Sequence, residues 1–226
     1  MSKISAITPE TLDVSKLSLS NDSYEMNINN GCMITRKVQC MYGDKKYPFV
    51  IDIPLVTVGS LGIPNLRDTY QSSDQNRMYM DIPLVYKDDG VFNMIESIDS
   101  WGSSLFPEDD AWSYSPLVRE GTLQSMIRLK MRSKRVNKVK VLDIKCDCIE
   151  DKINTVSALT KYVRKYACVG LRVLVKQVWI RYGINCIDYG LTLEIIKLNE
   201  FKASTTPFDI DDDASNNNID LNDMFD

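Results

Sequence analysis

The basic side chains of residues 126–140 are the residues of this sequence best placed to do chemistry. The segment MIRLKMR, residues 126–132, alternates apolar and basic residues, so Arg128, Lys130 and Arg132 share one face of a predicted strand. The basic loop SKRVN and a further strand follow it, which predicts a β-hairpin with a basic surface. Guanidinium and ammonium groups in this arrangement can neutralise a row of phosphates.

The charge of the chain is distributed unevenly. The 226 residues carry a net charge of −4, yet residues 119–181 contain 16 basic and 5 acidic side chains. A local excess of positive charge in an acidic protein indicates a polyanionic partner. Unpaired bases can also stack on aromatic side chains, so the polyanion that we expect is a single strand of nucleic acid.

Ten side chains are the candidates for contacting phosphates: Arg119, Arg128, Lys130, Arg132, Lys134, Arg135, Lys138, Lys140, Lys176 and Arg181. Trp112 and Tyr114, which lie in a predicted polar loop, and Tyr182, at the end of a strand, are the candidates for stacking on bases. Trp179 lies within an apolar strand, so we expect it to pack in the core.

The absence of histidine excludes several classes of enzyme. Ser-His-Asp and Cys-His nucleophiles, His-based proton transfer and His-ligated zinc are all ruled out. Cys146 and Cys148 are one residue apart and lack a matching second pair, which disfavours a cysteine zinc site. No glycine-rich phosphate loop is present. We therefore predict a non-catalytic protein with no catalytic residues, metal or cofactor.

The hydrophobic pattern predicts a mainly β fold. Strands are expected at residues 33–42, 47–53, 78–86, 126–132, 138–146, 169–181 and 189–198, with short helices at 91–101 and 151–163. This number of strands suggests a single barrel of the OB-fold type with one or two short helices. Residues 1–30 are expected to be a loose polar arm, residues 31–202 the nucleic-acid-binding domain and residues 203–226 a tail.

The tail is strongly acidic. Its segment PFDIDDDASNNNIDLNDMFD has seven aspartates and no basic residue, so we expect it to be disordered. A tethered polyanion can compete with DNA for a basic surface and, once displaced, recruit partners. The residues assigned to this role are Asp211, Asp212, Asp213, Asp220, Asp223, Phe225 and Asp226.

Several blocks of the chain resemble the single-stranded DNA-binding proteins of large nucleocytoplasmic DNA viruses, which are similar to the short-tailed-phage replication binding protein. The blocks are PLVTVGSLGIPN (54–65), MYMDIPLVY (78–86), FNMIESIDSW (92–101), YSPLVREGTLQSMIRLKM (114–131) and LRVLVKQVWIRYGINCIDYGLTLEIIKL (171–198). The resemblance implies an OB-fold core, binding of single-stranded DNA in viral replication, recombination or repair, and a tail that contacts a polymerase or helicase. One departure is that Asp226 follows the aromatic Phe225.

Two other functions remain open from the residues alone: a viral RNA-coating structural or movement-type β protein, and a nuclease with a carboxylate-bound metal. Whether the protein forms a homodimer is also open. No apolar run is long enough to span a bilayer and no secretion signal is visible, so we expect an intracellular protein without a membrane partner, in the host cytoplasm, a viral factory or the nucleus.

Overall fold

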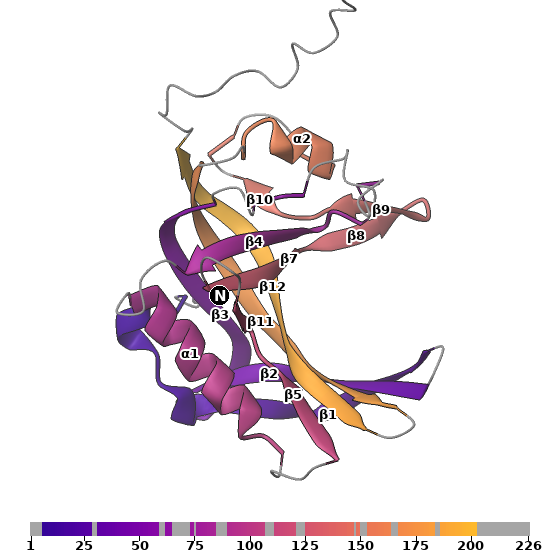
Figure 1. Ribbon diagram of the computed structural model, residues 1–226. Helices are drawn as coiled ribbons and strands as arrows, with labels where there is room; N and C mark the ends of the chain where they lie inside the picture. Colours follow the sequence, from indigo (N-terminus) through magenta and orange to yellow (C-terminus); the bar gives the residue numbers. More distant parts are fainter. Residues whose placement is uncertain are drawn as a thin grey trace, which may run out of the picture.

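The computed structural model describes residues 6–28, 31–58, 62–64, 73–74, 76–84, 90–106, 111–120, 125–146, 148–149, 153–163, 167–183 and 186–202. These residues form the mainly β fold expected from the sequence, with two α-helices (Figure 1). The strands are β1 (Leu17–Ile28), β2 (Gly31–Tyr42), β3 (Lys45–Thr57), β4 (Tyr79–Leu84), β5 (Trp112–Ser115), β6 (Val118–Glu120), β7 (Ser125–Met131), β8 (Ser133–Val136), β9 (Val139–Leu142), β10 (Lys145–Cys146), β11 (Cys168–Tyr182) and β12 (Ile187–Lys202). The helices are α1 (Gly90–Ser103), α2 (Val156–Thr160) and two 3-10 turns, Pro9–Thr11 and Val14–Lys16.

The long antiparallel pair β11–β12 is the spine of one sheet, ordered β1-β2-β3-β11-β12-β7-β4. The first half of β11 pairs with β3, and its second half, from Gln177 to Tyr182, pairs with β2. On the other side of the spine, β12 pairs in parallel with β5, β7 and β10. Because β1 and β4 are at opposite ends of this order, the described sheet is open and does not close into the OB-fold-like barrel expected from the sequence.

One face of the sheet, the inner face, holds the core. It carries Ile127, Leu129 and Met131 of β7, all with 0% of their surface exposed, together with the apolar residues of β4, β11 and β12. Helix α1, which the sequence predicted at residues 91–101, covers this face through Val91, Ile95 and Ile98, which repeat at helical spacing. The opposite, outer face carries Arg128 and Lys130.

A β-bulge in β11 changes which residues of that strand face the core. Val175 pairs with Leu193, whereas Gln177 pairs with Thr192, so Lys176 is an extra residue on β11. Apart from Gly170, which has no side chain, the buried positions before the bulge are odd-numbered and end at Val175, and those after it are even-numbered, Val178 and Ile180. The shift places Trp179 on the outer face, so the expectation that it packs in the core is wrong.

The N-terminal segment is not the loose arm that we expected, because Leu17–Ile28 forms β1. Nine residue pairs join this strand to β2 in antiparallel register, with an irregularity between Leu19 and Ser23. The guanidinium of Arg36 donates to the Ser20 carbonyl oxygen at 2.8 Å within that irregularity. Residues 21–27 are exposed on both faces, so apolar alternation is absent and only backbone pairing reveals the strand.

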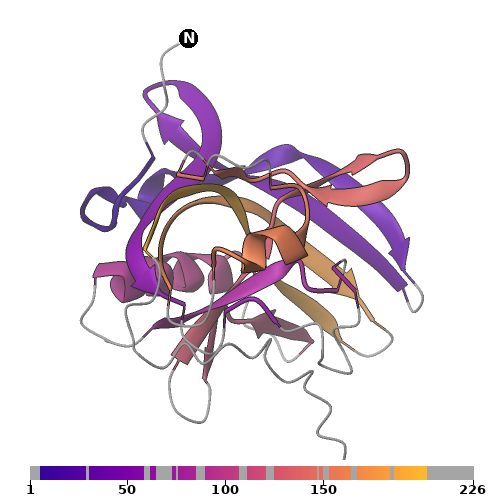
Figure 2. The ribbon, with the colours of Figure 1, turned by 90° about the horizontal axis from the view of Figure 1, so that it is seen from above.

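Two projections extend from the same side of the molecule. One is the β8–β9 hairpin, and the other, here called the lower arm, comprises Ser23–Ile28, Gly31–Arg36, Trp179–Tyr182 and Ile187–Gly190. Both point the same way in two views at right angles (Figures 1 and 2). The outer face of the sheet continues from β7 across β12 and β11 into the lower arm, because cross-strand partners share a face.

Candidate nucleic-acid interface

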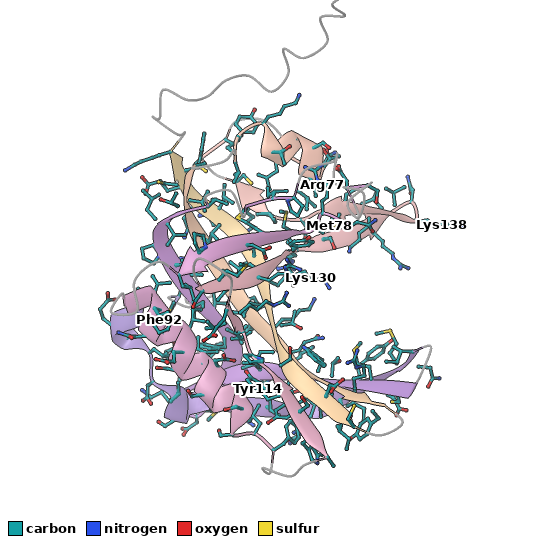
Figure 3. All side chains as sticks on the ribbon, in the orientation of Figure 1. Arg77, Met78, Phe92, Tyr114, Lys130 and Lys138 are labelled. Atoms are coloured by element: carbon teal, nitrogen blue, oxygen red, sulfur yellow. The ribbon has the colours of Figure 1, made fainter. Side chains whose placement is uncertain are left out.

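A hollow lies on the outer face beside the β8–β9 hairpin. Its volume is about 320 Å³, and it is lined by Asn76, Met78, Tyr79, Arg128, Lys130, Lys140, Leu191, Thr192 and Leu193. β7 supplies Arg128 and Lys130 from alternate positions, and β9 supplies Lys140. Figure 3 shows Lys130 on β7 and Lys138 at the far tip of the hairpin. Strand alternation therefore brings cations together as the sequence predicts.

Five of the predicted phosphate ligands already have a carboxylate partner. Arg128 makes two bonds of 2.7 Å to Asp81 and lies 4.0 Å from the centre of the Tyr79 ring. Lys176 contacts the buried Glu194 at 3.1 Å. Arg132 and Lys134 share Asp143, and Arg181 is paired with Asp188. These pairs reduce the net positive charge that the five cations present.

The other five have no ion-pair partner in the described part of the chain: Arg119, Lys130, Arg135, Lys138 and Lys140. Lys140 is half-buried, and burial lowers the pKa of its ammonium group, as do the nearby charges of Lys130 and Arg135. Arg135 faces Lys140 directly across the hairpin. Like charges held together in this way favour a bound anion, which would relieve their repulsion.

The turn of the hairpin has a strained backbone. Asn137 and Lys138 both have positive φ, at 49° and 68°, as a two-residue type I′ turn requires. Asparagine tolerates this conformation, but a lysine there is uncommon. The turn holds the Lys138 ammonium group at the tip of the projection.

Two of the predicted stacking residues are engaged within the protein. Trp112 and Tyr114 lie in β5, not in a loop, and both pack against Tyr189 on the inner face. The Trp112 ring also stacks on Phe106, with centroids 4.8 Å apart. The Tyr114 hydroxyl donates a hydrogen bond to Asp99 of α1, and burial raises the pKa of that hydroxyl. Figure 3 shows Tyr114 beside α1.

Tyr182 is more accessible, with 37% of its surface exposed, but it lies on the same face as Ile180. The phosphate candidates Lys176 and Arg181 are on the other face. The structure therefore does not bring Tyr182 together with the basic hollow.

Two aromatic residues on the outer face were not predicted from the sequence as stacking candidates. Trp179 is half-buried there, and Tyr24 of β1 is 66% exposed. Trp179 and Tyr24 are both cross-strand partners of Thr35, so all three share a face. The polar pair Lys176-Gln177 interrupts the apolar alternation of β11. This interruption was the feature of the sequence from which the outward position of Trp179 could have been predicted. No apolar pattern marked Tyr24.

Among the residues that the structure describes, no group of three or more Cys, Asp or Glu side chains is arranged to hold a metal ion. None of the described helices has the length and apolar character needed to cross a bilayer. The tail residues Asp211, Asp212, Asp213, Asp220, Asp223, Phe225 and Asp226 lie outside the described residues. Comparison with models of known protein families found no match, and comparison with curated proteins found none either.

Proposed function

We propose that this protein is a non-catalytic binder of single-stranded DNA. The observation that supports the proposal is a group of three cations that form no salt bridge within the described residues: Lys130 and Lys140, which line the hollow, and Arg135, which faces Lys140 across the hairpin. Phosphates of a DNA strand neutralise such a group, and the release of their counterions supplies affinity that falls as salt rises.

The hollow also has apolar surface beside its cations. Leu191, Leu193 and Met78 contribute to its lining, and Arg128 covers one face of the Tyr79 ring. A flexible single strand can place a base against such surface, whereas the bases of a duplex are already stacked on each other. This supports a preference for single strands over duplex.

The first test is a salt titration of binding to oligo(dT), comparing the full chain with Lys130→Ala/Lys140→Ala. We expect the double substitution to lower affinity and to reduce the slope of log affinity against log salt by about 1–2, because each lost phosphate contact removes roughly one unit. Lys45→Ala/Lys46→Ala is the matched control: it removes the same charge from the exposed start of β3, away from the hollow.

Equal slopes for the two double variants would contradict the proposed site. Equal affinity for oligo(dT) and duplex would contradict the proposed class of ligand, and tighter binding of RNA than of DNA would favour the RNA-coating alternative. The resemblance to viral single-stranded DNA-binding proteins supports the further proposal that the acidic tail competes with DNA and recruits a polymerase or helicase.

A further inference from the structure

The lower arm carries a second basic and aromatic group, separate from the hollow. Its centre is Trp179, whose ring lies over Gly190: a Cβ atom built on Gly190 would come within 2.9 Å of the indole and 3.0 Å of the Ser115 carbonyl oxygen. Only glycine leaves room for the indole at this position. The sheet backbone therefore supports the ring from beneath.

Two cations lie on either side of this indole on the same face. Arg181 is two residues further along β11, and Lys37 is the cross-strand partner of Gln177, two residues before Trp179. The Arg181 side chain is 54% exposed although it is paired with Asp188. Lys37 is exposed and has no ion-pair partner in the ranges that the structure describes. A flat ring between two cations matches the alternation of bases and phosphates in a single strand.

The position of Trp179 relative to the hollow fits one continuous ligand. Lys130 pairs with Glu194, and Trp179 pairs with Gly190, four residues earlier on β12. Four residues of a strand span about 13 Å, and the side chains between the two positions, including Thr192, belong to the same outer face. Tyr24 extends the face by two further strands, or about 10 Å.

Four aromatic residues nearer the hollow lack this combination. Trp112, Tyr114 and Tyr189 contact one another on the inner face, and Arg128 already covers one face of Tyr79. We infer that the lower arm is a base-binding platform: an unpaired base stacks on Trp179, the neighbouring phosphates contact Lys37 and Arg181, and the strand continues over Tyr24. This inference rests on the proposed function and adds the site that recognises bases.

The test uses tryptophan fluorescence of the full-length chain, which has three tryptophans. In Trp101→Phe/Trp112→Phe, only Trp179 remains, and stacking should strongly quench its emission when oligo(dT) is added. In the matched variant Trp101→Phe/Trp179→Phe, only Trp112 remains, and we expect little quenching because its ring is packed against Phe106. Quenching confined to the second variant would overturn the inference.

Affinity provides an independent readout. Trp179→Ala should weaken binding of oligo(dT) by about tenfold or more, with little effect on duplex, because only unpaired bases can stack on the ring. Tyr24→Ala should weaken it less, and since Tyr24 is exposed this variant should fold normally. Circular dichroism and a melting curve check the fold of each variant.

The outcomes separate the inference from the proposed function. If the full chain binds oligo(dT) with the expected salt dependence, but Trp179 is not quenched and both alanine variants bind normally, the platform is disproved and the function stands. If no salt-dependent binding to oligo(dT) is found, the proposed function fails and the platform fails with it.

Discussion

At the scale of single residues, Lys140 links binding to pH. Burial and the charges of Lys130 and Arg135 lower the pKa of its ammonium group below the ordinary 10.5, so in the free protein it loses its proton earlier than a solvated lysine as pH rises. A bound phosphate favours the charged form and raises that pKa again. Affinity for DNA should therefore be highest at neutral pH and fall as pH rises towards the pKa of the free protein.

Lys140→Arg checks this prediction, because arginine stays protonated throughout the same range. We expect the wild type, measured by fluorescence anisotropy between about pH 7.5 and 10, to lose more affinity than this variant. Parallel loss in both proteins would show that Lys140 is not the group responsible.

Asp52 gives the corresponding prediction for stability. Two bonds from Arg172, of 2.8 Å and 2.7 Å, lower the pKa of the Asp52 carboxyl group, with a smaller contribution from Asn199. A carboxyl group with a lowered pKa in the folded state stabilises the protein above its unfolded pKa, and this stabilisation is lost as pH falls below about 4. Asp52→Asn should lower the free energy of unfolding by about 1 kcal/mol at pH 7, since the pair is partly exposed.

Urea unfolding at pH 7 and near pH 3 measures the effect. The difference between Asp52→Asn and wild type should shrink at the lower pH. Asp44→Asn, a change of the same kind in the exposed β2–β3 turn, should have almost no effect at either pH. A constant deficit for Asp52→Asn at both pH values would mean that the loss is unrelated to the charge of the carboxylate.

At the scale of secondary-structure elements, Lys138 in the β8–β9 turn lowers the stability of the hairpin but adds a positive charge at its tip. Replacing Lys138 with glycine creates the Asn-Gly sequence that type I′ turns prefer and relieves the positive φ of 68°. We expect Lys138→Gly to raise the free energy of unfolding by about 0.5–1 kcal/mol. The same variant loses one cation, so it should lower the slope of the salt titration by about one.

Lys138→Ala separates the two effects because it removes the charge but keeps a side chain at positive φ. It should show the same loss of salt dependence without the gain in stability. Hydrogen exchange of the hairpin amides, together with urea unfolding, reports the stability part. A glycine variant that binds with the full salt slope would remove Lys138 from the interface.

The same scale shows what the sequence could predict. The alternation in residues 126–132 predicted β7 and its basic outer face, and the hydrophobic pattern of residues 91–101 predicted α1. Both elements have one buried face, so their periodicity is strong. β1 has little buried surface, and Trp179 follows a bulge, so in neither case does a simple period mark which side chains face the core.

The candidate site was predictable to a similar extent. The cations of the hollow come from a regular strand and the adjoining hairpin, and were therefore found. Trp112 and Tyr114 were misplaced because their contacts with Tyr189 and Asp99 join segments distant in sequence. Which cations are already paired with carboxylates, as Lys176 is with Glu194, also depends on tertiary contacts that no local pattern records.

At the scale of the whole molecule, the prediction concerns the balance between the basic outer face and the acidic tail. A chain that ends at Ala203 lacks the seven aspartates of the last 20 residues. If the tail competes with DNA, this truncated chain should bind oligo(dT) more tightly than the full chain, with the largest gain at low salt, where attraction between charges is least screened.

A full-length chain in which the seven aspartates are replaced by asparagine is the control for length. It should bind as tightly as the truncated chain, because the competition depends on charge. Affinity that is unchanged in both proteins would leave the tail without a part in DNA binding.

The single extra residue in β11 also has a genetic consequence. Loss of the codon for Lys176 would remove the extra residue and leave Gln177 directly after Val175. Alternation along the strand would then be unbroken, with Val178 and Ile180 still facing the core and Trp179 still on the outer face. Loss of Arg128 from the regular strand β7 would instead move Leu129 from the core to the outer face. In a library of one-residue deletions, we therefore expect loss of Lys176 to be tolerated better than loss of Arg128.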